Sequence, residues 1–116
     1  MEEYRVDIVV EFEASDKSYL AISNAVHGAV KGLCSSHAYI KGEGKNRLCF
    51  FSLPNKNIRL KQSEQEFSEN IAKRVWKANK GYCDVEVVLQ HHPKLPKEKV
   101  SKFSKSQYNA LTKRSK

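Results

Sequence analysis

No stretch of this chain approaches the about 18 consecutive apolar residues that a membrane-spanning helix needs. The N-terminus reads Met-Glu-Glu, whereas a secretory signal starts with basic residues and continues with an apolar run. These two absences argue against a membrane partner. They predict a cytoplasmic, intracellular protein.

Cysteine is scarce, and its spacing matches no known framework. There are three cysteines, Cys34, Cys49 and Cys83, and none belongs to a C-x-x-C pair. An odd number without pairing motifs predicts reduced thiols rather than a disulfide scaffold, and Cys49 is expected in the core. Catalytic triads and phosphate-binding loops are also missing from the sequence. We therefore expect no catalytic residue, no metal site and no cofactor.

Acidic residues are almost missing from the C-terminal part of the chain. Residues 93–116 contain one acid, Glu98, against eight Lys and Arg, so this segment carries +7 of the formal net charge of +8. Residues 1–92 carry the remaining +1. The sequence therefore predicts a nearly neutral folded domain over residues 1–92, followed by a basic extension over residues 93–116. A cationic extension of this kind suits a polyanionic partner.

The first half of the domain shows two clear periodicities. Residues 4–13 alternate strictly, which predicts a half-buried strand with Tyr4, Val6, Ile8, Val10 and Phe12 on its buried face. A helix capped by Ser15 or Asp16 follows, because residues 19–33 carry apolar side chains at spacings of three and four. This helix is expected to end near Cys34.

The second half predicts a hairpin, a helix and a strand. Residues 37–41 and 47–53 flank a Gly-rich loop and read as paired strands. Ser63 and Glu66 form a capping box for a helix that buries Phe67, Ile71 and Val75 and ends at Gly81. The last strand is expected over residues 84–90.

The order strand-helix-strand-strand-helix-strand predicts an α+β fold. We expect a ferredoxin-like βαββαβ two-layer sandwich, with a four-stranded antiparallel sheet and both helices on one face. In the extension, apolar or long side chains share one helical face, at Val100, Phe103, Gln107 and Leu111, with Tyr108 beside it. This pattern favours a helix that docks on the domain or folds on contact. The Ser- and Lys-rich composition is equally compatible with disorder.

The open sheet face is a poor candidate for base stacking. An RNA-recognition motif presents aromatic side chains on its central strands, but Tyr4 and Phe12 are in phase with the buried positions of the first strand. The opposite face of that strand carries Asp7, Glu11 and Glu13, which repel phosphate.

Basic residues cluster at three places, which together favour a non-catalytic nucleic-acid-binding protein that contacts phosphates. The fold favours RNA over DNA. The places are the hairpin loop, the solvent side of the second helix and the C-terminal extension. The candidate contacts are Lys41, Lys45, Arg47, Lys73, Arg74, Lys77, Lys80, Lys94, Lys97, Lys99, Lys102, Lys105, Lys113 and Arg114.

Two other classes of function remain open. A mixed open sheet face and unpaired edge strands suit a protein-interaction module, such as a small regulator or inhibitor, with a protein partner or a second copy of the chain. The carboxylates Asp7, Glu11 and Glu13 share one strand face, which would suit a Mg²⁺-dependent nuclease.

Overall fold

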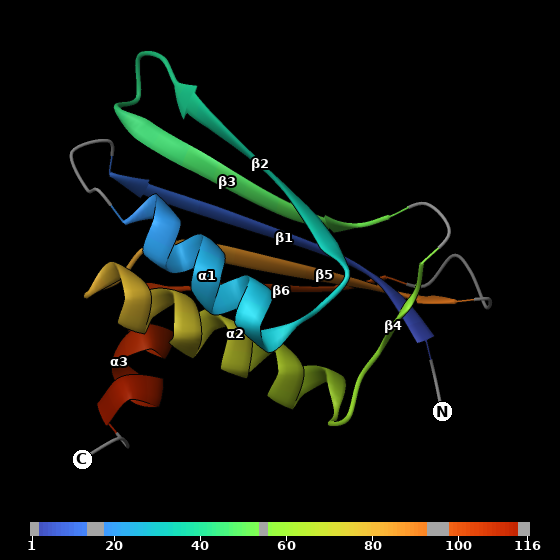
Figure 1. Cartoon of the computed structure of the whole chain (residues 1–116). Helices are drawn as coiled ribbons and strands as arrows, with labels where there is room; N and C mark the ends of the chain where they lie inside the picture. The colour runs from blue at the N-terminus through green and yellow to red at the C-terminus, as the bar shows by residue number, and fades with distance from the viewer. Residues whose placement is uncertain (1–2, 14–17, 54–55, 93–97, 114–116) are drawn as a thin grey trace.

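The chain folds as an α+β protein with one antiparallel sheet and three helices (Figure 1). The computed structural model describes residues 3–13, 18–53, 56–92 and 98–113. The elements, in chain order, are β1 (Glu3–Glu13), α1 (Tyr19–Ala29), β2 (Leu33–Ile40), β3 (Lys45–Ser52), β4 (Ile58–Arg59), α2 (Glu64–Asn79), β5 (Asp84–His92), β6 (Glu98–Phe103) and α3 (Lys105–Lys113).

The sheet has six strands, so the expectation of four is wrong. Its order is β2-β3-β1-β5-β6, and the short β4 pairs with the start of β1. The largest difference is β6, which the sequence assigned to a helical or disordered extension. This segment pairs along β5, with Val100 opposite Val88 and Phe103 opposite Val85. Pairing gives partners to backbone groups on that edge of β5 that a four-stranded sheet would leave unpaired.

The core lies between the sheet and the helices. The predicted alternation of β1 is confirmed: Tyr4, Val6, Ile8, Val10 and Phe12 are buried. The facing side chains come from β3, β5 and the helices, all of which lie on one side of the sheet (Figure 1). No described helix covers the other side of the sheet. Burial of these apolar side chains is the main favourable contribution to the free energy of folding.

The helix α1 ends earlier than the apolar spacing predicts. It stops at Ala29, and Leu33 and Cys34 already belong to β2. Gly32 lies between the end of α1 and the start of β2 and has a φ of 94°, a conformation that residues with side chains rarely adopt. This glycine turns the chain into β2. The observed N-cap is Ser18, whereas Ser15 and Asp16 lie outside the described residues.

The capping box of α2 is confirmed. The amide of Glu66 donates to Ser63 Oγ at 3.1 Å, and the amide of Ser63 donates to Glu66 Oε1 at 3.4 Å. At the other end the left-handed residue is Lys80, with a φ of 61°, rather than Gly81 as predicted. The buried face is broader than Phe67, Ile71 and Val75, because it also contains Ser68, Ala72 and Trp76.

None of the three described cysteines forms a disulfide, but Cys49 is not in the core. It lies half-buried on the open face of β3, whereas Cys83 is buried before β5. The period of two decides this placement: Leu48 and Phe50 face the helices, so Cys49 and Phe51 face the opposite side.

Candidate nucleic-acid interface

An aromatic cluster joins α3 to the rest of the protein. Trp76 packs edge-on against Tyr108 with ring centroids 5.1 Å apart, and against Phe103 at 5.8 Å. Tyr82 packs on Tyr108 at 5.7 Å. The indole Nε1 of Trp76 donates to the carbonyl of Cys83 at 2.9 Å, so the one polar atom of this buried ring has a partner. These contacts hold α3 beside the C-terminal half of α2.

The Tyr82 hydroxyl ties this cluster to β5 and β6. It lies 2.8 Å from Asp84 Oδ1 and 3.0 Å from the carbonyl oxygen of Phe103. Burial, followed by the hydrogen bond to Asp84, raises the pKa of Tyr82 to about 12. The phenol therefore remains a donor through the neutral pH range.

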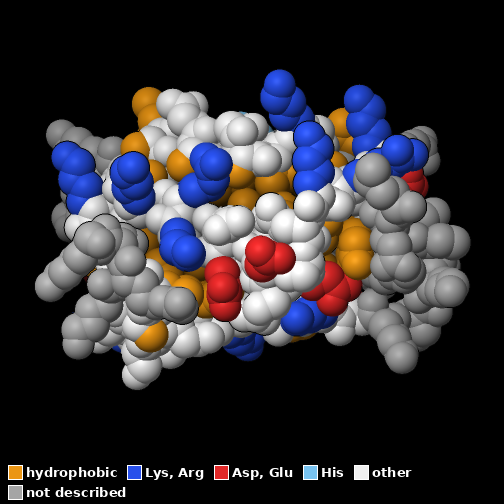
Figure 2. Space-filling view, turned by 90° about the horizontal axis from the view of Figure 1, so that it is seen from below, with side chains coloured by type: hydrophobic (Ala, Val, Ile, Leu, Met, Phe, Trp, Pro, Cys, Tyr) orange, Lys and Arg blue, Asp and Glu red, His pale blue; other side chains and the backbone are white. Residues whose placement is uncertain are grey.

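A groove rimmed with lysines lies between α2 and α3. It measures about 440 Å³ and is lined by Lys73, Trp76, Lys77, Lys80, Gly81, Tyr108 and Thr112. Residues 73–80 carry four cations and no acid, while the acids of α2 occupy its N-terminal half. This distribution stabilises the helix through its dipole. It also concentrates positive charge at the C-terminal end of α2. Figure 2, seen from below, shows Lys and Arg side chains across the upper half of the view and most acidic ones lower down.

Several predicted phosphate contacts on α2, α3 and β6 do not line the α2–α3 groove. Arg74 is exposed on α2 beside a small hollow that includes Asn70, and Lys105 is exposed at the start of α3. Lys113 is the last residue of α3. Lys99 faces the helix side of β6, because it pairs with the buried Leu89. The predicted contacts Lys94, Lys97 and Arg114 lie outside the described residues.

Two of the three hairpin cations, Lys45 and Arg47, contact carboxylates. Arg47 contacts Glu11, with Nη2 2.6 Å and Nε 2.8 Å from Oε2. Lys45 lies 3.6 Å from Asp84. Lys41 is exposed in the turn that follows β2. The clusters predicted from the sequence are therefore not equivalent, because two hairpin cations have carboxylate partners whereas residues 73–80 of α2 and its C-cap include no acid.

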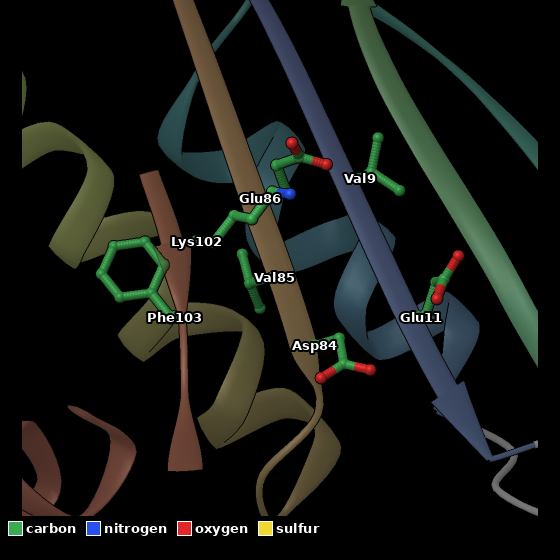
Figure 3. Close-up of a pocket in the computed structure, with 7 residues that line it drawn as sticks. All are labelled: Val9, Glu11, Asp84, Val85, Glu86, Lys102 and Phe103. Atoms are coloured by element: carbon green, nitrogen blue, oxygen red, sulfur yellow. The ribbon is translucent and has the colours of Figure 1, made fainter. Parts of the chain in front are cut away.

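The open face of the sheet is acidic (Figure 3). Its hollow is lined by Val9, Glu11, Asp84, Val85, Glu86, Lys102 and Phe103. Figure 3 shows Lys102 extending across β5 toward Glu86, its cross-strand partner. Among described positions on this face, seven acids oppose five cations, a net charge of −2; the acids are Glu3, Asp7, Glu11, Glu13, Asp84, Glu86 and Glu98, and the cations Arg5, Lys45, Arg47, Arg59 and Lys102.

Asp7 occupies an apolar position on this acidic face. It lies directly opposite Phe51 on β3 and Val88 on β5. Burial raises the pKa of Asp7 above its ordinary value of 3.8; Arg5 opposes this shift, and Glu98 adds to it. The charged carboxylate is therefore less stable here than in the unfolded chain.

Replacing Asp7 by Asn is expected to stabilise the protein at neutral pH. The folded state holds the Asp7 proton more tightly, so the stability linked to that proton is lost as pH rises from 3.8 through the raised pKa. Urea denaturation should show a higher midpoint for Asp7→Asn at neutral pH and none of this gain below pH 3.8. Glu13→Gln, on the same face but opposite Lys45, is the control and should show no gain. Equal gains in both variants would contradict this prediction.

The carboxylates of this face do not form a metal site in the described part of the chain. Within residues 3–13, 18–53, 56–92 and 98–113, no three His, Cys, Asp or Glu side chains form a group that could hold a metal ion. Glu11 is occupied by Arg47, and Asp7 is flanked by apolar side chains. The Mg²⁺-dependent alternative therefore gains no support from this geometry.

None of the described helices is long and apolar enough to cross a membrane. A scan against protein-family models finds no match to this chain, and searches of curated proteins and solved structures likewise find no significant match.

The sequence missed the role of Trp76, Tyr82 and Tyr108. Ser68, Ala72 and Trp76 follow each other at spacings of four, which is the signal of a second buried row beside Phe67, Ile71 and Val75. Nothing local indicated that Tyr108 would complete that row from α3, since the two side chains are 32 positions apart in the sequence.

Proposed function

We propose that this protein binds nucleic acid without catalysing a reaction, and that Lys73, Lys77 and Lys80 contact phosphates at the α2–α3 groove. The supporting observation is the groove itself, which three lysines rim and no acid lines. Ammonium groups at helical spacing suit successive phosphates of a backbone, and such contacts give affinity without sequence specificity. Trp76 is 2% exposed, so it positions α3 and is not available for base stacking.

The separation of charge supports the same proposal. The open sheet face carries a net −2 at its described positions, whereas residues 73–80 carry +4. A polyanion is attracted to the groove and repelled by the sheet face, which orients the protein on its ligand. The basic residues of the C-terminal extension that lie outside the described part, Lys94, Lys97 and Arg114, would add to the attraction. RNA is the favoured ligand, with DNA as the competing one.

We infer that β1, α1, β2, β3, α2 and β5 make a ferredoxin-like unit to which β4, β6 and α3 are added. The order β2-β3-β1-β5, with antiparallel neighbours throughout, supports this inference. So does the position of α1 and α2 on one face of the sheet (Figure 1). In this arrangement the α2–α3 groove exists only because α3 is added to the ferredoxin-like unit and supplies one wall of the groove.

Replacing Lys73, Lys77 and Lys80 together by Gln should weaken binding and reduce its dependence on salt. Removing one phosphate contact lowers the slope of log K against log salt by about 0.7–0.9, so removing three lowers it by about 2 to 3. The fold should be unchanged, because all three side chains are exposed and Gln is nearly as good a helix former as Lys at the two helical positions, 73 and 77. The measurement is fluorescence anisotropy with labelled mixed-sequence RNA and DNA over a series of KCl concentrations.

The matched control is the triple variant Lys31→Gln, Lys56→Gln and Lys61→Gln. It removes the same charge from exposed positions that do not line the groove. If both triple variants reduce the slope equally, binding reflects net charge rather than this groove. If wild type binds neither nucleic acid at low salt, the proposal is wrong and a protein-interaction module takes its place. Cleavage of the labelled strand in Mg²⁺ would contradict the non-catalytic assignment.

A further inference from the structure

The strand β2 forms one edge of the sheet, and no described strand pairs with its outer side. The strand order places β2 and β6 at the two ends, and Figure 1 shows no described element beyond β2. β2 is eight residues long, and its five central residues, 35–39, are all exposed. Its outer edge therefore presents a row of backbone amides and carbonyls that a further strand could pair with.

The two edges differ in how they are protected. β6 carries Glu98, Lys99 and Lys102 among its six residues, and charged side chains on an edge discourage pairing with other chains. β2 reads Leu-Cys-Ser-Ser-His-Ala-Tyr-Ile and contains no Lys, Arg, Asp, Glu or Pro. A long, uncharged edge strand without proline is the kind that accepts a further strand.

Exposed apolar side chains gather at the same edge. Five large hydrophobic side chains are exposed in the described part of the chain, and three of them are Tyr19 at 41%, Leu20 at 60% and Tyr39 at 58%. Tyr19 stacks on His37 of β2 with ring centroids 4.7 Å apart. His37 and Tyr39 point to the same side of the sheet, because they are two residues apart. The first turn of α1 and the end of β2 thus leave an aromatic surface uncovered beside the free backbone edge.

We propose that β2 pairs antiparallel with β2 of a second copy of this chain. Antiparallel pairing of a strand with itself places a two-fold axis perpendicular to the sheet and sets one residue opposite its own copy, here Ser36 near the middle of the strand. Uncharged residues of β2 then face uncharged residues of its mate, so no like charges oppose within the paired strands. The helices of both copies lie on the same side of one continuous sheet.

A second copy fits this edge better than an unrelated extended peptide. A peptide would satisfy the backbone groups of β2, but it need not cover Tyr19 and Tyr39. A second copy brings its own Tyr19–His37 stack next to this one, because His37 is one residue from the axis, and it places its Leu33 opposite Tyr39. This proposal does not rest on nucleic-acid binding, since β2 and the α2–α3 groove share no residue.

The test is the oligomeric state of the full chain by sedimentation equilibrium. Wild type should be a dimer, and its dissociation constant should not rise with KCl, because the paired strand carries no charge and salt screens the repulsion between two chains of net charge +8. Ser36→Lys and Ser36→Glu, each alone, bring like charges together at the axis and should raise the dissociation constant by about fivefold. An equimolar mixture of the two variants should restore association as a heterodimer.

Ser106→Lys, an exposed serine on α3, is the matched control and should leave the dimer unchanged. Circular dichroism verifies that each variant is folded, and Ser36→Arg replaces Ser36→Lys if that variant does not fold. The proposal is overturned if wild type is monomeric at the highest concentration reached. It is overturned equally if the Ser36 variants dimerise like wild type, or if their mixture does not associate.

Discussion

Phe103→Ala is expected to lower the free energy of unfolding by about 3–5 kcal/mol, the range for truncating a buried aromatic side chain. Phe103 is 4% exposed and lies edge-on to Trp76. Its carbonyl accepts a hydrogen bond from Tyr82, and Ser104, the next residue, caps α3 through Gln107. Removing the ring leaves a cavity beside Trp76 and weakens the attachment of both β6 and α3.

Urea denaturation followed by Trp76 fluorescence measures this effect, since Trp76 is the single tryptophan of the chain. Val100→Ala is the control on the same strand, because Val100 is 49% exposed on the opposite face. Its effect should stay within about ±0.5 kcal/mol, as for surface substitutions. If Phe103→Ala behaves like Val100→Ala, residues 98–113 do not contribute to the core, and residues 1–92 fold on their own.

Ile8→Ala is expected to cost about 2–5 kcal/mol, and Ile8→Val about 0.5–1.5 kcal/mol. Ile8 is fully buried in the central strand, and the α2 side chain Ile71 is 1% exposed in the same core cluster. Removing methyl groups there leaves a cavity between the sheet and α2 that cannot close without moving a strand. Because the two substitutions differ only in the volume removed, the graded effect identifies packing as its cause.

Val9→Ala, one residue along and on the open face, should cost much less than Ile8→Ala. Val9 is partly exposed beside Cys49 and Glu86. Both unfolding free energies come from the same denaturation experiment. A larger destabilisation by Val9→Ala than by Ile8→Ala would mean that the strand faces the core with its other side.

The candidate site could be predicted only in part. The lysines of α2 were identified from helical spacing, because Lys73, Lys77 and Lys80 lie opposite the apolar stripe of the same helix. The hairpin cations looked equally suitable, yet Arg47 contacts Glu11 across 36 residues of sequence. Local sequence cannot reveal such a pair, since it depends on the register between β1 and β3.

Local patterns by themselves determined the elements whose side chains interact with near neighbours. The alternation of residues 4–13 selects a strand, and the reciprocal bonds of Ser63 and Glu66 select the start of α2; both were correct. Where the sequence was wrong, distant contacts outweighed local preference. Val100 and Phe103 have helical spacing, but β5 offers that segment unpaired backbone groups and Trp76 offers Phe103 a buried contact, so the chain extends. The tertiary structure alone decided the sixth strand, the α2–α3 groove and the unprotected edge of β2, because each depends on which distant segments meet.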